Sequence, residues 1–191
     1  LSWRNPDASD QDLSMDVYLN LGVFDALRAI GRLHGKQQAV HAMGYCLGGT
    51  LLAIAAAAVA RNGGCALAHD MPPLRSLSLL AAQTDFSEPG DLGLFIDDTS
   101  IGGIDQLIAD AGGVMPGEAM RDAFNLLRPE DLIWRYVEDR YLLGNEAKAF
   151  DLLYWNSDQT NLPGPLHVAS LRRFYLENAL AKGVFTVEGK P

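Results

Sequence analysis

The spacing of apolar residues predicts alternating helices and short strands in the first half of the chain. Between Leu13 and Leu33, apolar residues recur at intervals of three and four, as in an amphipathic helix, and Gly35 is expected to end it. The apolar runs Ala39–Tyr45 and Ser76–Ala82 indicate buried strands. The segment between them, Thr50–Arg61, is apolar almost all round, which is typical of a buried helix. This order of strand, helix and strand is a βαβ unit, so it predicts a parallel sheet.

After Asp85 the pattern changes to helices separated by turn-rich segments. We expect helices over Glu118–Leu127, Pro129–Leu143 and Val168–Lys182, and a last strand over Val184–Val187. The chain is therefore predicted to have an α/β fold in three parts. These parts are a core segment at 1–84, a mostly helical cap insertion at 85–182, and a return to a core strand at 183–191.

Composition and charge exclude several classes of protein. Of the 191 residues, 48% are apolar and 20% are charged, which is typical of a globular protein of one domain or slightly more. The longest strongly apolar stretch, Leu51–Ala60, is shorter than the roughly 18–20 residues of a membrane span. The net charge is −9 and no basic patch is present, which argues against nucleic acids and anionic membrane surfaces as partners.

The ends of the chain and its cysteines suggest a cellular context. No charged region followed by an apolar region marks a signal peptide, and the moderate net charge fits a cytoplasmic protein, which we expect. Both ends read like strands without neighbours, so we also expect a fragment of a longer protein. Two cysteines, Cys46 and Cys65, are too few for a disulfide-rich scaffold, and any cysteine chemistry would use a free thiol.

The motif that points to chemistry is Gly44-Tyr45-Cys46-Leu47-Gly48-Gly49, between a predicted strand and a predicted helix. It matches a nucleophile elbow with cysteine in place of serine. In such an elbow the nucleophile lies on a sharp turn, so we expect Gly44 and Gly48 to let the backbone pass. The helix N-terminus favours the nucleophilic thiolate of Cys46, and the N–H of Leu47 would donate to an oxyanion. The alternative is that Cys46 is a small buried apolar residue in a glycine-rich turn.

A cysteine nucleophile needs a base, usually a histidine oriented by a carboxylate. The order Cys46, Asp85, His167 is the order of an α/β-hydrolase triad. However, His167 is predicted at the start of a helix in the insertion, and Asp85 is also expected to cap a helix together with Glu88. The roles of both residues stay open. The other candidates by residue type are His34, His41, His69 and Cys65, the last in a surface loop where no role is expected.

Several segments together resemble the polyhydroxyalkanoate synthases, class I in particular, and they occur in the same order from end to end. They are Ser2-Trp3-Arg4-Asn5-Pro6, the motif from Gly44 to Thr50, Asp85-Phe86, Leu127 to Trp134, and Tyr154 to Pro165. The resemblance implies an α/β-hydrolase fold in which Cys46 is the nucleophile of a lipase-like box. It implies that (R)-3-hydroxyacyl-CoA is polymerised with release of CoA, and that no cofactor or metal is needed. It also implies that the catalytic Asp and His lie beyond residue 191, so the chain alone is expected to be nearly inactive.

The resemblance also implies partners and a path for the product. The partners are the hydroxyacyl-CoA, the growing polyester chain, a second copy of the full-length enzyme, and polymer granules. Apolar side chains of the cap either line the product path or only pack the cap: Leu132, Trp134, Tyr154 and Trp155. The pair Arg172 and Arg173 either contacts CoA phosphates or is a solvated helix face. Four polar residues match a family motif but are equally explained as turn formers: Asn156, Asp158, Thr160 and Asn161.

Two other functions compete with this interpretation. A dienelactone-hydrolase-like enzyme has a similar cysteine elbow but would hydrolyse the acyl-enzyme. The segments around Trp3, Trp134 and Trp155 and the long helical insertion argue against it. The third possibility is a non-catalytic, synthase-like protein that packs on a synthase or on polymer granules.

Overall fold

The computed structural model describes residues 1–61, 70–146 and 150–191. The first half contains a 3-10 turn, one long helix with a central π-helical stretch, and a strand–helix–strand unit. In chain order these are Ala8–Asp10, α1 (Met15–Val17), Tyr18–Phe24, α2 (Asp25–His34), β1 (Val40–Tyr45), α3 (Leu47–Ala60) and β2 (Leu74–Leu80). The long helix ends where predicted, because Gly35 has a φ of 89°, a conformation that glycine adopts without strain.

The second half is mainly helical. Its elements are a 3-10 turn (Gly90–Phe95), α4 (Asp98–Asp110), β3 (Val114–Met115), α5 (Gly117–Leu127), a π-helical turn (Glu130–Trp134), α6 (Arg135–Val137), a second π-helical turn (Glu138–Leu142), α7 (Asp151–Ser157), β4 (Leu162–Pro163), α8 (Gly164–Ser170) and its π-helical continuation (Leu171–Leu176). The helices predicted over Glu118–Leu127 and Pro129–Leu143 are confirmed. The last helix starts earlier and ends earlier than predicted, and α4 and α7 were not predicted.

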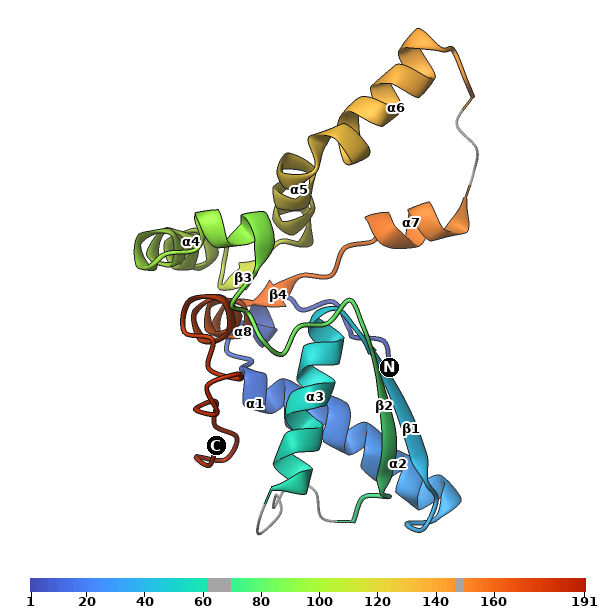
Figure 1. Cartoon of the computed structure of the whole chain (residues 1–191), viewed down its shortest axis with the longest axis vertical. Coiled ribbons are helices and arrows are strands. Elements are labelled where there is room, and N and C mark those ends of the chain that lie inside the picture. Colours follow the sequence, from blue (N-terminus) through green and yellow to red (C-terminus); the bar gives the residue numbers. More distant parts are fainter. Residues whose placement is uncertain (62–69, 147–149) are drawn as a thin grey trace.

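The strand–helix–strand unit has the predicted parallel topology. β1 pairs with β2 in parallel, from Val40 opposite Leu74 to Tyr45 opposite Leu80, and α3 makes the crossover. α3 packs on both strands and on the long N-terminal helix (Figure 1). It fits between them because small and aliphatic side chains cover its surface, and Leu51, Ile54 and Ala55 are buried.

The two strands form where the apolar runs predict them, but the prediction that they are buried is wrong. Met43 and Tyr45 on β1 are 70% and 63% exposed, and Leu79 and Leu80 on β2 are 40% and 47% exposed. A strand in a parallel sheet is buried on both faces only when other elements cover both. In the described residues, α3 covers one face of this two-stranded sheet.

One hydrophobic core joins the N-terminal helix, α3 and the helix that starts at α8. Leu19, Phe24 and Phe174 are fully buried at its centre. The ring of Phe86 stacks on Phe174 with centroids 5.3 Å apart. Burial of a large apolar side chain contributes roughly 1.5–3 kcal/mol, so contacts between segments far apart in sequence hold these three helices together.

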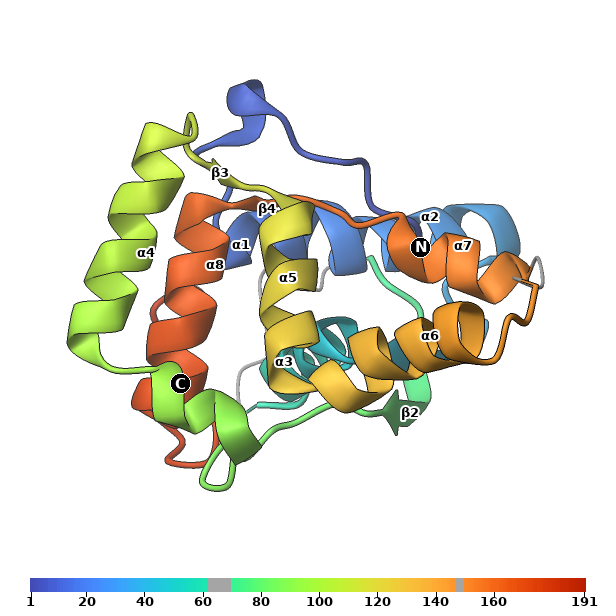
Figure 2. The ribbon, with the colours of Figure 1, turned by 90° about the horizontal axis from the view of Figure 1, so that it is seen from above.

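The remaining helices divide between a packed pair and a projecting arm. α4 and α8 lie side by side (Figure 2) and pack through the buried Ile101 and Ile108 of α4. α5 and α6 extend away from the sheet and α3 (Figure 1), and α7 follows them in the chain. We call residues 117–146 and 150–157 the arm. It has several large apolar side chains that are more than three-quarters exposed: Leu126, Tyr141, Leu142 and Tyr154.

The strand predicted at Val184–Val187 is not formed. Val187 makes only an isolated antiparallel bridge with Lys190. Glu188 and Gly189 have φ values of 54° and 70°, so the chain reverses between the two bridge residues. The guanidinium of Arg61 donates to the carbonyls of Val187 and Lys190, at 2.8 and 3.0 Å, and holds this turn against the end of α3.

Candidate active site

Cys46 occupies the single-residue corner between β1 and α3. Its backbone φ is 50° and its ψ is −130°, a region that residues other than glycine rarely adopt and that often marks functional sites. Its N–H donates to the carbonyl of Leu80 at 2.9 Å, and its carbonyl accepts from Gly49 and Thr50 at 2.9 and 3.2 Å. Cys46 is an exposed free thiol, so the alternative of a buried structural cysteine is wrong.

The close backbone approach at this corner involves Gly44 and Gly49. A Cβ on Gly44 would lie 2.5 Å from the Cα of Gly49, and a Cβ on Gly49 would lie 2.5 Å from the Cβ of Ala82. By contrast, a Cβ on Gly48 would meet no atom within 4 Å. The expectation for Gly44 is therefore confirmed, whereas the expectation that Gly48 lets the backbone pass is wrong. Gly48 lies in the first turn of α3 and faces open space. The residue that must lack a Cβ for close packing is the next one, Gly49.

The first turn of α3 is placed firmly beside Cys46. Leu47 is the first residue of α3, a position whose N–H has no acceptor within the helix. The hydroxyl of Thr50 is buried and donates to the carbonyl of Gln83 at 2.7 Å, which ties this turn to the chain that follows β2. Leu47 and Gly48 both line the cavity where Cys46 lies, and whether the N–H of Leu47 donates to an oxyanion stays a prediction.

A cavity of about 440 Å³ opens at Cys46. Its walls come from the N-terminal segment, the long helix, the corner itself, and the chain between α7 and α8. They are Trp3, Met15, Tyr18, Tyr45, Cys46, Leu47, Gly48, Leu51, Trp155, Asp158, Gln159, Thr160, Asn161, Leu162 and Leu166. Most of this surface is apolar, so it suits an acyl chain better than a charged ligand. Among these wall residues, within the described chain, there is no histidine and Asp158 is the one carboxylate.

Asp85 and His167 are not among these wall residues. Asp85 caps no helix, which corrects the capping prediction, because no helix starts directly after it. Its carboxylate instead accepts from the side chain of Asn178 at 2.8 Å and the N–H of Ser87 at 2.9 Å, and these bonds lower its pKa. His167 is buried on α8, and burial lowers its pKa. Whether either residue takes part in catalysis stays a prediction.

The other residues singled out by type fall in different places. His34 ends α2 and is exposed, and the ring of His41 on β1 contacts the hydroxyl of Ser76 at 2.7 Å. Cys65 and His69 lie outside the described residues.

The aromatic and apolar residues expected in the cap do not act as one group. Trp155 lines the Cys46 cavity. Leu132, Trp134 and Tyr154 are 41%, 56% and 80% exposed and are not among the walls of this cavity, and whether they line a product path or pack the cap stays a prediction. The arm that carries these three residues extends away from the sheet and α3 (Figure 1).

Aromatic residues around Cys46 were not selected from the sequence as wall residues, Trp3 and Tyr18 among them. Trp3 and Tyr18 line the cavity, and their rings pack with centroids 4.9 Å apart. Tyr175 packs edge-on against Phe86, with centroids 4.8 Å apart. Burial raises the pKa of Tyr175, and the charge of Cys46 adds to the rise. Local spacing gives no signal for such contacts, because they join segments far apart in the chain.

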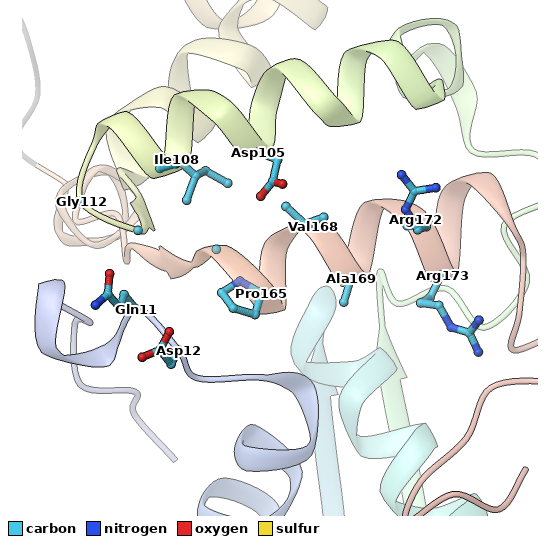
Figure 3. A pocket seen from close by; sticks show the side chains of 13 residues that line it. Gln11, Asp12, Asp105, Ile108, Gly112, Pro165, Val168, Ala169, Arg172 and Arg173 are labelled. Carbon is cyan, nitrogen blue, oxygen red and sulfur yellow. The ribbon is translucent and has the colours of Figure 1, made fainter.

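Arg172 and Arg173 border a different cavity, of about 580 Å³, between α4, α8 and the N-terminal segment. Figure 3 shows Asp105 on α4 and Val168 on α8 projecting into the space between the two helices. Arg172 pairs with Asp98 at 2.7 Å, and Arg173 pairs with Glu177 at 2.7 Å. Each guanidinium therefore already has a carboxylate partner, which agrees with a helix-surface role better than with a phosphate site.

The described residues hold neither a candidate metal site nor a candidate membrane span. They contain no group of three or more His, Cys, Asp or Glu side chains that could hold a metal ion. Within the same part of the chain, every helix is too short or too polar to cross a membrane.

Comparison with known proteins supports the resemblance seen in the sequence, although no protein-family model matches the chain. It is 42% identical over 183 residues to the poly(3-hydroxyalkanoate) polymerase of Methylorubrum extorquens, which covers 96% of this chain and 29% of that protein. It is 40% identical over 190 residues to the poly(3-hydroxyalkanoate) polymerase subunit PhaC of Rhizobium meliloti, covering 100% of this chain and 30% of the relative. The corresponding subunit of Cupriavidus necator is 37% identical over 196 residues, covering 100% and 32%. The chain thus spans about 30% of the length of these relatives.

Proposed function

We propose that this chain is the segment of a poly(3-hydroxyalkanoate) polymerase that carries the nucleophile, Cys46. One observation carries the proposal. An exposed thiol, on a strained strand-to-helix corner, opens into a mostly apolar cavity in a chain that is similar throughout to such polymerases. The substrate is a (R)-3-hydroxyacyl-CoA, the products are the polyester and CoA, and no cofactor is required.

The first step is transfer of the acyl group to Cys46. The thiolate attacks the carbonyl carbon of the acyl-CoA, the bond to the CoA sulfur breaks, and CoA leaves as a thiolate. The intermediate oxyanion accepts a hydrogen bond from the N–H of Leu47 at the start of α3. Because one thioester replaces another, the acyl group on Cys46 keeps its reactivity.

The second step extends the polymer. A base removes the proton from the hydroxyl at the end of the growing chain, and this oxygen attacks the acyl group on Cys46. An ester bond forms, the bond to the Cys46 sulfur breaks, and the thiolate is restored. We propose that the base and its carboxylate partner come from the rest of the polymerase, because no histidine among the described residues lines the Cys46 cavity.

The wider architecture belongs to the same proposal. Segment 1–84 is part of an α/β-hydrolase core, and 85–182 is a helical insertion that caps the Cys46 cavity in the complete polymerase and limits access of water to the acyl group. The exposed apolar surface of β1 and β2 suits a larger parallel sheet, in which further elements of the polymerase pack over Met43, Tyr45 and Leu79. The complete enzyme is expected to work in the cytoplasm as a homodimer at the surface of polymer granules.

The test uses the full-length polymerase that carries this chain, incubated with 3-hydroxybutyryl-CoA. We expect insoluble polyester together with one released CoA per monomer, and neither product from the Cys46→Ala variant. Soluble 3-hydroxybutyrate as the main product would support the dienelactone-hydrolase-like alternative. Absence of any CoA release would support the non-catalytic alternative.

A further inference from the structure

Three segments that are far apart in the sequence meet at Asn161. The first is the N-terminal segment around Asn5, the second is the start of the arm at Gly117, and the third is the loop 158–161 itself. That loop forms one wall of the Cys46 cavity. The hydrogen bonds of Asn161 therefore join the cavity wall to both neighbouring segments.

Asn161 uses both polar atoms of its side chain and its backbone N–H in this junction. Its Oδ1 accepts from the N–H of Gly117 at 2.9 Å, and its Nδ2 donates to the carbonyl of Pro6 at 3.1 Å. Its backbone N–H donates to the Oδ1 of Asn5 at 2.8 Å. A side-chain amide is suited to this place, because it donates and accepts at the same time.

The start of the arm at Gly117 packs closely against the loop 158–161. A Cβ on Gly117 would lie 2.7 Å from the Cβ of Gln159 and 3.1 Å from the carbonyl oxygen of Thr160. Directly beside it, β3 pairs with β4 through Met115 opposite Leu162. The start of α5 and the cavity wall therefore form one continuous joint.

The N-terminal segment brings an aromatic wall to the same cavity. Trp3 lines it, and the indole lies directly over Gly22, where an added Cβ would come within 2.2 Å of the ring. The indole also packs against Tyr18, which is another wall residue. Asn5 and Pro6 follow Trp3 closely in the chain, so the bonds from Asn161 limit how far this wall can move.

We propose that Asn161 is a positioning residue that holds the Trp3 segment and the base of α5 against the loop 158–161 and so limits the access of water to the acyl group on Cys46. This inference rests on the proposed function, because it concerns the fate of the acyl group on Cys46. If the joint loosens, water competes with the chain-end hydroxyl. Water then attacks the acyl carbon, the bond to sulfur breaks, and a free 3-hydroxy acid leaves while the thiol is restored.

The experiment measures how acyl groups divide between polymer and free acid in the full-length polymerase. Three variants are compared with the wild type: Asn161→Ala, Asn161→Asp and Asn5→Ala. Asn161→Asp keeps the acceptor for Gly117 but loses the donor to Pro6, so it separates the two sides of the joint. The matched control is Asn145→Ala, because the side chain of Asn145 donates to Asp139 on the exposed arm and is not a cavity wall. Activities are normalised to the amount of Cys46 that 3-hydroxybutyryl-CoA acylates in the first turnover.

We expect Asn161→Ala to raise the fraction of acyl groups released as free 3-hydroxybutyrate about tenfold, and Asn161→Asp and Asn5→Ala to raise it by a smaller factor. The control should divide them as the wild type does. Wild-type division in Asn161→Ala and Asn5→Ala, with normal acylation of Cys46, would overturn the role of Asn161 but leave the proposed function intact. No acylation of wild-type Cys46 would overturn the proposed function itself. If Asn161→Ala does not fold, Asn5→Ala decides, because Asn5 is exposed and loses one hydrogen bond.

Discussion

The three glycines around Cys46 provide a sharp test of the geometry of the corner. A motif of the form Gly-x-Cys-x-Gly treats Gly44 and Gly48 as equivalent. The structure does not, because a Cβ on Gly44 would lie 2.5 Å from the Cα of Gly49, whereas a Cβ on Gly48 would have no neighbour within 4 Å. Substituting each of the two with alanine should therefore change stability in opposite directions.

The magnitudes follow from the atoms that each new Cβ meets. Carbon atoms pack at about 3.5–4.0 Å, so Gly44→Ala has to move backbone by about 1 Å at a corner with little freedom. Such overpacking costs roughly 1–3 kcal/mol. Gly48→Ala replaces glycine in a helix without a clash, which stabilises the protein by up to about 1 kcal/mol. Gly49→Ala combines both effects, since its Cβ would meet Ala82 at 2.5 Å while the helix gains propensity, so its cost should be smaller.

Two measurements check this prediction. Urea unfolding gives the free energy of unfolding of each variant, and Gly44→Ala is expected to be less stable than Gly48→Ala by about 1–4 kcal/mol. Alkylation by iodoacetamide, followed by peptide mapping to separate Cys46 from Cys65, reports the exposure of the thiol. The reasoning is refuted if Gly48→Ala destabilises the protein as much as Gly44→Ala, or if Gly44→Ala is as stable as the wild type.

Three further predictions concern the core, the pH dependence of stability and the cavity wall. Phe174→Ala should cost about 3–5 kcal/mol in urea unfolding, because the ring is fully buried and stacked on Phe86; a loss below about 1 kcal/mol would contradict the described core. Burial lowers the pKa of His167, so the unfolded state binds the proton more readily, and stability should fall as the pH drops below about 6.5, by at most about 1.4 kcal/mol per pH unit. His167→Gln should flatten this dependence in urea titrations at several pH values, and an unchanged slope would exclude His167 as its source. Gly22→Ala should push the Trp3 ring off the cavity wall and so shift the fluorescence of Trp3. The signal of Trp3 is obtained by subtracting the spectrum of a Trp3→Phe protein. An unchanged Trp3 spectrum in Gly22→Ala would show that the ring does not lie over Gly22.

The features that could be predicted from the sequence are those set by local patterns. The amphipathic spacing from Leu13 to Leu33 defines the long helix, and the apolar runs on either side of α3 define the two parallel strands. The cysteine between them lies at the corner, as its motif indicates. These elements form from residues that are close in sequence, so periodicity and turn chemistry are sufficient to find them.

Other features depend on contacts that local patterns do not report. Gly102 and Gly103 disfavour a helix, yet α4 forms there because its Ile101 and Ile108 are buried against neighbouring elements. In the same way, Gly49 is sterically constrained in part by Ala82, which follows β2 and is far from Gly49 in the sequence. The bond between Asn161 and Asn5 joins residues 156 positions apart, so no sequence window contains both.

The central claim is that Cys46 accepts the acyl group, and the most direct measurement is the mass of the enzyme during turnover. The full-length polymerase is mixed with 3-hydroxybutyryl-CoA, quenched in acid within the first turnover, and digested for peptide mass analysis. Our account predicts one 3-hydroxybutyryl group, or a short oligomer of it, on the peptide that contains Cys46, and no such adduct in Cys46→Ser. Polymer formation with the acyl group on another residue, or undiminished synthesis by Cys46→Ser, would contradict it.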